Sequence, residues 1–273
     1  MKYYLQKLIR YLVDKNLLGI YFINWTNFNI IFDPSSARIY QVIGGKQVFI
    51  GNSKHALPII EKNRTDLIEW LCSEVYYKNY LPKTGDVVLD IGTGYGHEIV
   101  WLTNFVNDIK VICVEPNPEV FGYLRLNTAK IKNIQNLNLY VGDKSSVIFP
   151  FSANYASSHS NVTFEFGWEV NGIRLDNIAG SYEKIDLLKV NIEGGELELF
   201  EKSIAKNIKR IIVSCHDFRA KRGDGDFFYT YDKVRKILKE KGYNLSDIRP
   251  KYYPNVSWAS SVPFWIYAEK SCQ

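Results

Sequence analysis

Acidic side chains and glycines recur where the apolar runs of this 273-residue chain end. The run 87–89 leads to Asp90 and then into a turn that contains Gly92 and Gly94. Glycine lets such a turn take positive φ and lets a ligand approach the backbone, and the helix that follows offers unpaired N–H groups. A carboxylate beside the turn suits a ligand that carries positive charge and repels a pyrophosphate.

The spacing of these glycines departs from the dinucleotide-binding pattern. That pattern places its third glycine three residues after the second, where this chain has His97, and the third glycine stands at Gly96 instead. With an acid before the first glycine, the turn resembles motif I of class I S-adenosylmethionine (SAM) methyltransferases. A glycine turn also connects ordinary strands and helices, so the next strands must support this interpretation.

The following apolar run, Lys110–Val114, ends at Glu115. An acid at the end of the second strand can accept hydrogen bonds from both hydroxyls of a ribose. In the enzymes that the first turn resembles, the third strand often supplies a carboxylate to the adenine amino group. The resemblance therefore implies Asp143 for this role, although an acid in a turn is unremarkable by itself.

A second informative run lies between Ile185 and Glu196 and reads IDLLKVNIEGGE. Its apolar strand acquires polar groups at the carboxyl end, so we expect Asn191, Glu193 and Glu196 to face the same cleft as the glycine turn. Together with the segments 90–94, 115–117, 124–127 and 174–176, this run resembles the FkbM-type family of SAM-dependent methyltransferases over roughly residues 85–250.

This resemblance implies a class I methyltransferase fold, SAM as the cofactor, and O-methylation of a sugar or of a sugar-bearing natural product. The chain departs from the family pattern at Asn191, where an Asp is usual, and at Gly195, where an Ala is usual. Without a carboxylate, position 191 is a weak choice for deprotonating the substrate or for holding a metal. The expected cofactor-binding residues are Asp90, Gly92, Gly94, Glu115, Asp143 and Asn191.

Methyl transfer to a hydroxyl needs a group that removes the proton of the acceptor. His216 follows the apolar run 211–215 and is the first choice for this base, since histidine has a pKa near operating pH. A hydrogen-bonded strand-end histidine is the structural alternative, and His159 is the second choice for the base. Glu193 is expected to orient the acceptor, because a helix N-terminus makes a carboxylate a poorer base. The expected catalytic residues are thus His216, Glu193 and Asn191, and no metal is included.

Strands and helices alternate after residue 80, which predicts an α/β fold with a doubly wound, mostly parallel, seven-stranded sheet. Strands are predicted near residues 86–91, 110–115, 136–141, 185–191, 209–215, 243–249 and 262–268. The polar stretch 144–184 interrupts the alternation. Residues 1–80 are predicted to form a helix and a small β-sheet that cap a methyltransferase domain at 81–273.

The composition places the chain among globular proteins, with 46% hydrophobic and 23% charged residues. A net charge of +5 and the lack of a dense basic tract speak against nucleic acid as a partner. Four cysteines without metal or disulfide spacing fit a reducing, cytoplasmic compartment. No apolar run is long enough to span a membrane. The helical stripe within residues 2–18 suits packing on the domain or on a second copy of the chain, or lying on a membrane surface.

Several alternatives remain open at this level. An NAD-dependent oxidoreductase is disfavoured by His97, and a base or amide nitrogen methyltransferase lacks its Asn-Pro-Pro-aromatic motif. Methylation of another acceptor, RNA or protein, is the nearer alternative. Asn191 also leaves room for a protein that binds SAM without catalysis.

Overall fold

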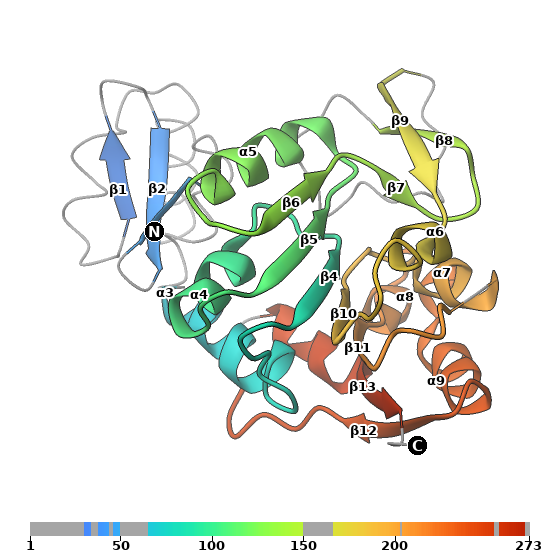
Figure 1. Ribbon diagram of the computed structural model, residues 1–273. Coiled ribbons are helices and arrows are strands. Elements are labelled where there is room, and N and C mark those ends of the chain that lie inside the picture. Colours follow the sequence, from blue (N-terminus) through green and yellow to red (C-terminus); the bar gives the residue numbers. More distant parts are fainter. Residues whose placement is uncertain are drawn as a thin grey trace, which may run out of the picture.

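Seven strands form the central sheet of the computed structural model, which describes residues 30–33, 38–43, 46–49, 65–149, 166–202, 204–253 and 257–270 (Figure 1). Their order across the sheet is β12-β13-β11-β10-β4-β5-β6. Their bounds are β4 Val87–Ile91, β5 Lys110–Val114, β6 Ile134–Leu137, β10 Leu187–Val190, β11 Arg210–Ser214, β12 Tyr243–Asp247 and β13 Trp265–Lys270.

Strands β4, β5, β6, β10 and β11 pair in parallel, and β13 runs antiparallel between β11 and β12. β4, β5, β10 and β11 are almost wholly buried, because helices cover both faces of a parallel sheet. The predicted fold class, an α/β fold with a mostly parallel seven-stranded sheet, is confirmed.

Helices cover the sheet on both sides (Figure 1). One buried cluster joins η1, α4 and α5 to one face, and a second joins α6, α7 and α9 to the other. The helical elements are α3 Thr65–Trp70, η1 Leu71–Tyr76, α4 His97–Phe105, α5 Pro118–Thr128, α6 Leu175–Ala179, α7 Glu196–Lys202, α8 Asp217–Lys221, η3 Asp226–Phe228, α9 Tyr231–Glu240 and η4 Ser257–Phe264. In the described part of the chain, none of these helices has the length and apolar character of a membrane span.

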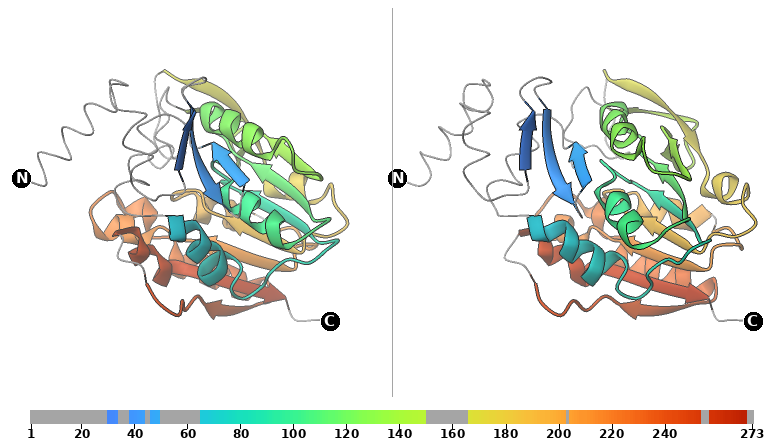
Figure 2. Two further views of the ribbon diagram at one scale, coloured as in Figure 1. Left: turned by 90° about the vertical axis from the view of Figure 1, so that its left-hand side faces the viewer. Right: turned by 60° about the vertical axis from the view of Figure 1, so that its left-hand side comes forward.

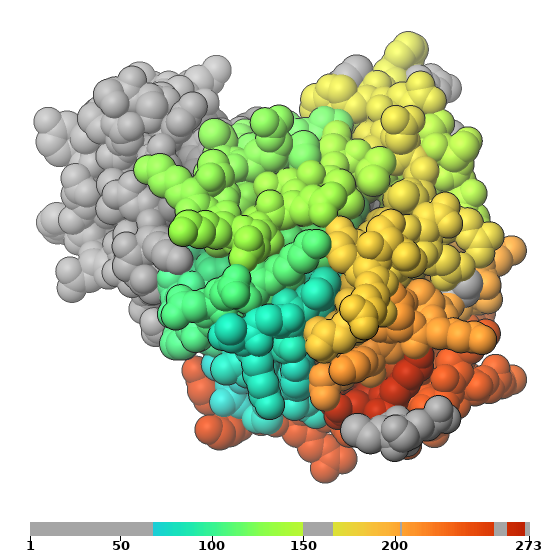
Figure 3. Space-filling model, in the orientation of Figure 1, coloured from blue at the N-terminus to red at the C-terminus, as the bar shows by residue number. Residues whose placement is uncertain are grey.

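The third predicted strand ends earlier than expected. Asn138 donates through its side-chain amide to the backbone carbonyls of Glu115 and Pro116, both at 2.9 Å. These two bonds hold Asn138 at the place where the chain leaves the central sheet after Leu137. A second, three-stranded sheet then follows, in the order β7-β9-β8, with bounds β7 Tyr140–Val141, β8 Ser146–Phe149 and β9 Trp168–Ile173. The atoms of residues 166–190 lie directly beside those of 110–149 on the face shown in Figure 3.

The last strand is also shifted, because the 3-10 helix η4 occupies Ser257–Phe264 and β13 begins only at Trp265. In the N-terminal region, β1 Ile30–Asp33, β2 Arg38–Ile43 and β3 Lys46–Phe49 pair antiparallel where short strands were predicted, and they lie next to α4 and α5 (Figure 2). The helix predicted within 2–18 and His159 fall outside the described residues. The division at residue 80 stays a prediction.

Candidate active site

A cavity of about 750 Å³, counting the part open to solvent, lies at the carboxyl ends of β4, β5 and β10. This edge of the sheet is the place where open α/β sheets bind ligands. The lining residues come from four segments of the chain: Ile91 and Gly92; Glu115, Pro116 and Asn117; Leu139, Tyr140, Val141 and Phe149; and Asn191, Ile192, Glu193 and Gly195.

Gly92 allows the first and the last of these segments to approach each other. Its φ is 78°, and a Cβ atom there would lie 2.1 Å from the backbone oxygen of Asn191. The backbone N–H of Asn191 in turn donates to the backbone carbonyl of Ile91 at 3.0 Å. A larger residue at position 92 would push the two turns apart, so the glycine is needed for the shape of the cavity floor.

Glu115 reaches the cavity from the end of β5. One oxygen accepts the backbone N–H of Gly94 at 3.0 Å and the other accepts that of Asn117 at 2.9 Å. Burial raises the pKa of this carboxyl to about 7, although both backbone hydrogen bonds lower it. Its position at the glycine turn is the one that a ribose-binding acid requires.

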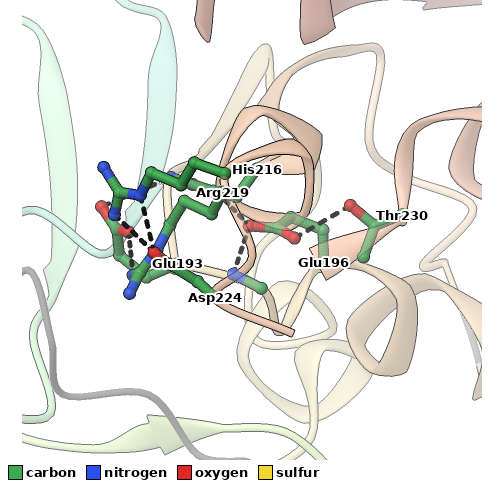
Figure 4. A network of polar contacts seen from close by, with 8 residues as sticks. Glu193, Glu196, His216, Arg219, Asp224 and Thr230 are labelled. Carbon is green, nitrogen blue, oxygen red and sulfur yellow. Dashed lines mark hydrogen bonds and ion pairs between the residues drawn. The ribbon is translucent and has the colours of Figure 1, made fainter. Parts of the chain in front are cut away.

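On the other side of the cavity, Glu193 belongs to a network of charged side chains (Figure 4). One of its oxygens lies 3.3 Å from Nε2 of His216, and the other accepts a hydrogen bond from Arg219 at 2.8 Å. Nδ1 of His216 lies 2.6 Å from Glu196, which is fully buried. Glu196 also accepts the hydroxyl of Thr230 at 3.1 Å.

The charges of this network set the pKa values of its members. Burial disfavours the charged form of His216, but Glu193 and Glu196 outweigh it and raise the pKa of the ring to about 10. Burial also disfavours the ionised form of Glu193, yet His216 and Arg219 hold its pKa below the usual value. The arrangement is therefore an ionised carboxylate at the cavity wall, backed by two cations.

Residues 90–245 match the family model of the methyltransferase FkbM domain, which covers more than half of the chain. The protein belongs to the FkbM methyltransferase family. It is accordingly a SAM-dependent methyltransferase, and the predictions of family, enzyme class and cofactor are confirmed. No curated protein matches the chain.

Solved structures with a similar course of the chain are distant. A SAM-dependent methyltransferase from Aquifex aeolicus is 19% identical, with 76% of this chain and 93% of that chain covered and a TM-score of 0.42. An O-methyltransferase from Bacillus cereus in complex with SAH is 10% identical, with 68% and 74% covered and a TM-score of 0.41. Aeropyrum pernix fibrillarin with bound SAM is 14% identical, with 74% and 73% covered and a TM-score of 0.40.

In this FkbM methyltransferase, Asp90 does not line the cavity. Its side chain is fully buried on the opposite face of β4 from Leu89 and Ile91, and it forms an ion pair of 2.9 Å with the buried Lys189 on β10. Successive residues of a strand point to opposite faces of the sheet. Ile91, the last residue of β4, lines the cavity, so Asp90 points to the other face and into the core. The predicted contact of Asp90 with the cofactor has no support in this geometry.

Asp143 lies outside the cavity as well. It is near Lys202, at 3.7 Å, and lines a smaller hollow with Arg174 and Glu198. The early end of β6 explains this displacement, because Tyr140 and Val141 then line the cavity where the expected carboxylate would be. The Tyr140 hydroxyl donates to Glu198 at 2.9 Å, which fixes the ring. Neither Tyr140 nor Phe149 was predicted as a site residue from the sequence, because aromatic residues in apolar runs usually indicate core packing.

Asn191 lines the cavity as predicted, and its half-buried side chain has no hydrogen-bond partner among the residues described. Asp217, the neighbour of His216, instead accepts the backbone N–H groups of Thr230 and Tyr231 at the start of α9. Within the described ranges, no three His, Cys, Asp or Glu side chains are grouped so that they would hold a metal ion.

Proposed function

We propose that the protein methylates a hydroxyl of a sugar, a glycan or a glycosylated natural product. The observation that carries this proposal is a single cavity with Glu115 on one side and Glu193 on the other. The first suits the ribose of the cofactor, and the second suits the hydroxyl of an acceptor. FkbM membership supplies methyl transfer, and the acceptor class is our inference.

The cavity residues fit SAM in their chemistry. Glu115 would hold the ribose hydroxyls, and the apolar side chains of Leu139, Tyr140, Val141 and Phe149 would surround the adenine. At Gly94 an added Cβ would meet no atom within 4 Å, so this part of the turn leaves room for the amino-acid portion of the cofactor. When bound, SAM supplies a methyl group activated by its sulfonium charge.

Glu193 is the group that we expect to receive the acceptor proton. A hydroxyl that forms a bond to carbon becomes strongly acidic, so even a carboxylate with a low pKa can accept its proton at that stage. The amide of Asn191, on the same wall, would orient the acceptor by hydrogen bonds. His216, the base predicted from the sequence, lies behind Glu193 and does not line the cavity.

Two features beside the cavity support a neutral, sugar-like acceptor. Arg219 pairs with Glu193 and Asp224, and Arg222 pairs with Asp224, so each of these cations of the segment after β11 already has an anionic partner. The Phe227 ring is 39% exposed and packs against the turn at Gly194. A partly exposed aromatic ring next to a carboxylate can contact a sugar ring while the carboxylate holds a hydroxyl.

The test is methyl transfer from SAM to a panel of nucleotide sugars and methyl glycosides, with an RNA and a protein fraction beside it, read by mass spectrometry. We expect the methyl group on a sugar hydroxyl. Methylation of RNA or protein alone would contradict the proposed acceptor class.

Cofactor binding is tested separately with Glu115→Ala. We expect this change to weaken SAM binding at least roughly tenfold, because one good hydrogen-bonding group to a ribose is worth more than about 1.4 kcal/mol. Glu119→Ala, which removes a carboxylate outside the cavity on α5, is the matched control and should bind SAM like the wild type. Equal affinity in the two variants would remove Glu115 from the cofactor site.

A further inference from the structure

His216 is enclosed by two carboxylates, one at each ring nitrogen. Nδ1 lies 2.6 Å from Glu196 and Nε2 lies 3.3 Å from Glu193. An ionised carboxylate only accepts hydrogen bonds, so both ring nitrogens must donate and both must carry a proton. A ring in this state has no lone pair with which to remove a proton from an acceptor.

Glu196 is the anchor of this arrangement. It is fully buried at the start of α7, and besides His216 it accepts the backbone N–H of Gly194 at 2.9 Å and the hydroxyl of Thr230 at 3.1 Å. One carboxylate therefore fixes both the ring and the turn that carries Glu193. A buried carboxylate with all these partners is held rigidly, because losing any of them would leave a buried polar group unpaired.

The turn needs such support because its backbone is strained. Glu193 has a φ of 55° and Gly194 a φ of 102°. A residue with a Cβ atom adopts this left-handed conformation only at a cost of about 1–2 kcal/mol. Strain of this kind persists where the surrounding structure holds it, and it is common at active sites.

We propose that Glu196 and His216 are positioning residues of the methyl transfer: Glu196 fixes the His216 ring, and the ring together with Arg219 aims the Glu193 carboxylate at the acceptor hydroxyl. This inference rests on the proposed function, in which Glu193 receives the acceptor proton. Each oxygen of Glu193 is then bound by one cation and retains a lone pair for the hydroxyl.

The charged groups around His216 agree with this role. Glu193 and Glu196 face the ring from the segment after β10, while Asp217 and Arg219 belong to its own helix, α8. The pKa of about 10 for the ring means that it stays charged over the pH range in which enzymes normally work. A histidine that served as the base would have to be neutral in that range.

The first test is nitrogen-15 NMR of the histidine rings in the full-length protein, with His216 assigned by its loss in His216→Gln. We expect both ring nitrogens of His216 to be protonated at pH 8. In Glu196→Gln, whose amide can still accept from the ring and donate to Thr230, we expect deprotonation at least about one pH unit lower, because one of two anionic partners is lost. A neutral His216 in the wild type at pH 8 would overturn the proposal.

The second test is the pH dependence of kcat at saturating SAM with the sugar acceptor found in the panel. We expect kcat to fall at high pH, where His216 loses its proton. In Glu196→Gln this fall should begin at lower pH, while the KM for SAM stays unchanged. A limb that instead rises with pH and disappears in His216→Gln would make His216 the base and overturn the proposal.

Asp217→Asn is the matched control for these experiments. It removes a carboxylate that follows His216 in the sequence and accepts the backbone N–H groups of Thr230 and Tyr231 at the start of α9, and its pH profile should follow the wild type. A profile shifted as far as that of Glu196→Gln would contradict a specific role of Glu196. If the protein methylates no sugar, the proposed function fails, whereas the NMR result still decides the protonation of the ring.

Discussion

Glu193 is the residue at which the backbone, the charges and the cavity meet. Its left-handed conformation turns the side chain toward His216 and Arg219, and both cations hold it in the ionised form. A carboxylate kept in one orientation does not need a high pKa to assist methyl transfer, because the acceptor proton is lost late. Orientation, more than basicity, is then what the network supplies.

We expect two substitutions of Glu193 to have different outcomes. Glu193→Gln keeps the shape and loses the charge, and we expect kcat to fall by roughly 10²–10⁴, the usual contribution of a general base. Glu193→Ala should lower kcat at least as far and should also destabilise the fold, since His216 and Arg219 each lose one of their two carboxylate partners. The affinity of both variants for SAM should stay within about twofold of the wild-type value, because Glu193 lies on the acceptor side of the cavity.

Steady-state kinetics and SAM titration check this prediction, with Glu201→Gln on the exposed side of α7 as the control. Glu193→Gln with the kcat of the control would show that the carboxylate takes no part in the reaction.

The pKa of His216 also predicts how stability depends on pH. Its folded-state pKa of about 10 lies above the ordinary value of 6.5, so the protonated ring stabilises the fold fully below pH 6.5. This contribution is lost as pH rises through about 10. Urea unfolding at pH 6, 8 and 10 should therefore show a smaller free-energy difference between wild type and His216→Gln at each step upward. A free-energy difference that grows with pH would contradict the stabilising ion pairs of His216 with Glu193 and Glu196.

At the level of elements, the cavity exists because the turn after β4 touches the turn after β10. Gly92→Ala would place a Cβ against the backbone of Asn191 and would also strain a positive φ. We expect a loss of SAM affinity of more than about tenfold, because the clash deforms the cavity floor and a tenfold change is only about 1.4 kcal/mol.

Gly85→Ala is the matched control, since Gly85 has a φ of 84° and no atom within 4 Å of the added Cβ. It should lower the free energy of unfolding by about 1 kcal/mol, the usual cost of a left-handed alanine, and leave SAM affinity unchanged. Calorimetric titration separates the two variants, and equal SAM affinity would show that the contact at Gly92 is unimportant.

Which elements form was predictable, but where their side chains point was not. Continuous apolar runs indicated the central strands, because strands buried on both faces lack alternation. For the same reason, the runs could not tell which face of β4 Asp90 occupies. The enclosure of His216 depends on Glu193 and Glu196, twenty or more residues away, so the sequence showed only a strand-end histidine. At the point where the chain leaves the central sheet, the side chain of Asn138 bonds to the segment that follows β5, and no local sequence pattern indicates such a contact.

At the scale of the whole molecule, the ion pair of Asp90 and Lys189 joins the two central strands inside the core. Both side chains are buried, and burial raises the pKa of Asp90 to about 6. Removing one member leaves an unpaired charge, and such losses cost about 3–5 kcal/mol. Replacing both with apolar residues of similar volume often leaves stability unchanged. A double replacement can therefore show whether Asp90 serves only the fold or also binds the cofactor.

We therefore predict that Lys189→Met lowers the free energy of unfolding by about 3–5 kcal/mol, and that the double variant Asp90→Leu and Lys189→Met recovers most of this loss. Because Asp90 does not line the cavity, the double variant should bind SAM like the wild type. Denaturant unfolding and SAM titration measure both quantities. A folded, stable double variant that fails to bind SAM would return Asp90 to the cofactor site.

The most direct measurement is a crystal structure of the wild-type protein with S-adenosylhomocysteine. We predict the nucleoside in the cavity at the carboxyl ends of β4, β5 and β10, with both ribose hydroxyls bonded to Glu115 and the ligand sulfur on the side of Glu193. A nucleoside bound elsewhere, or one whose ribose does not touch Glu115, would contradict the account.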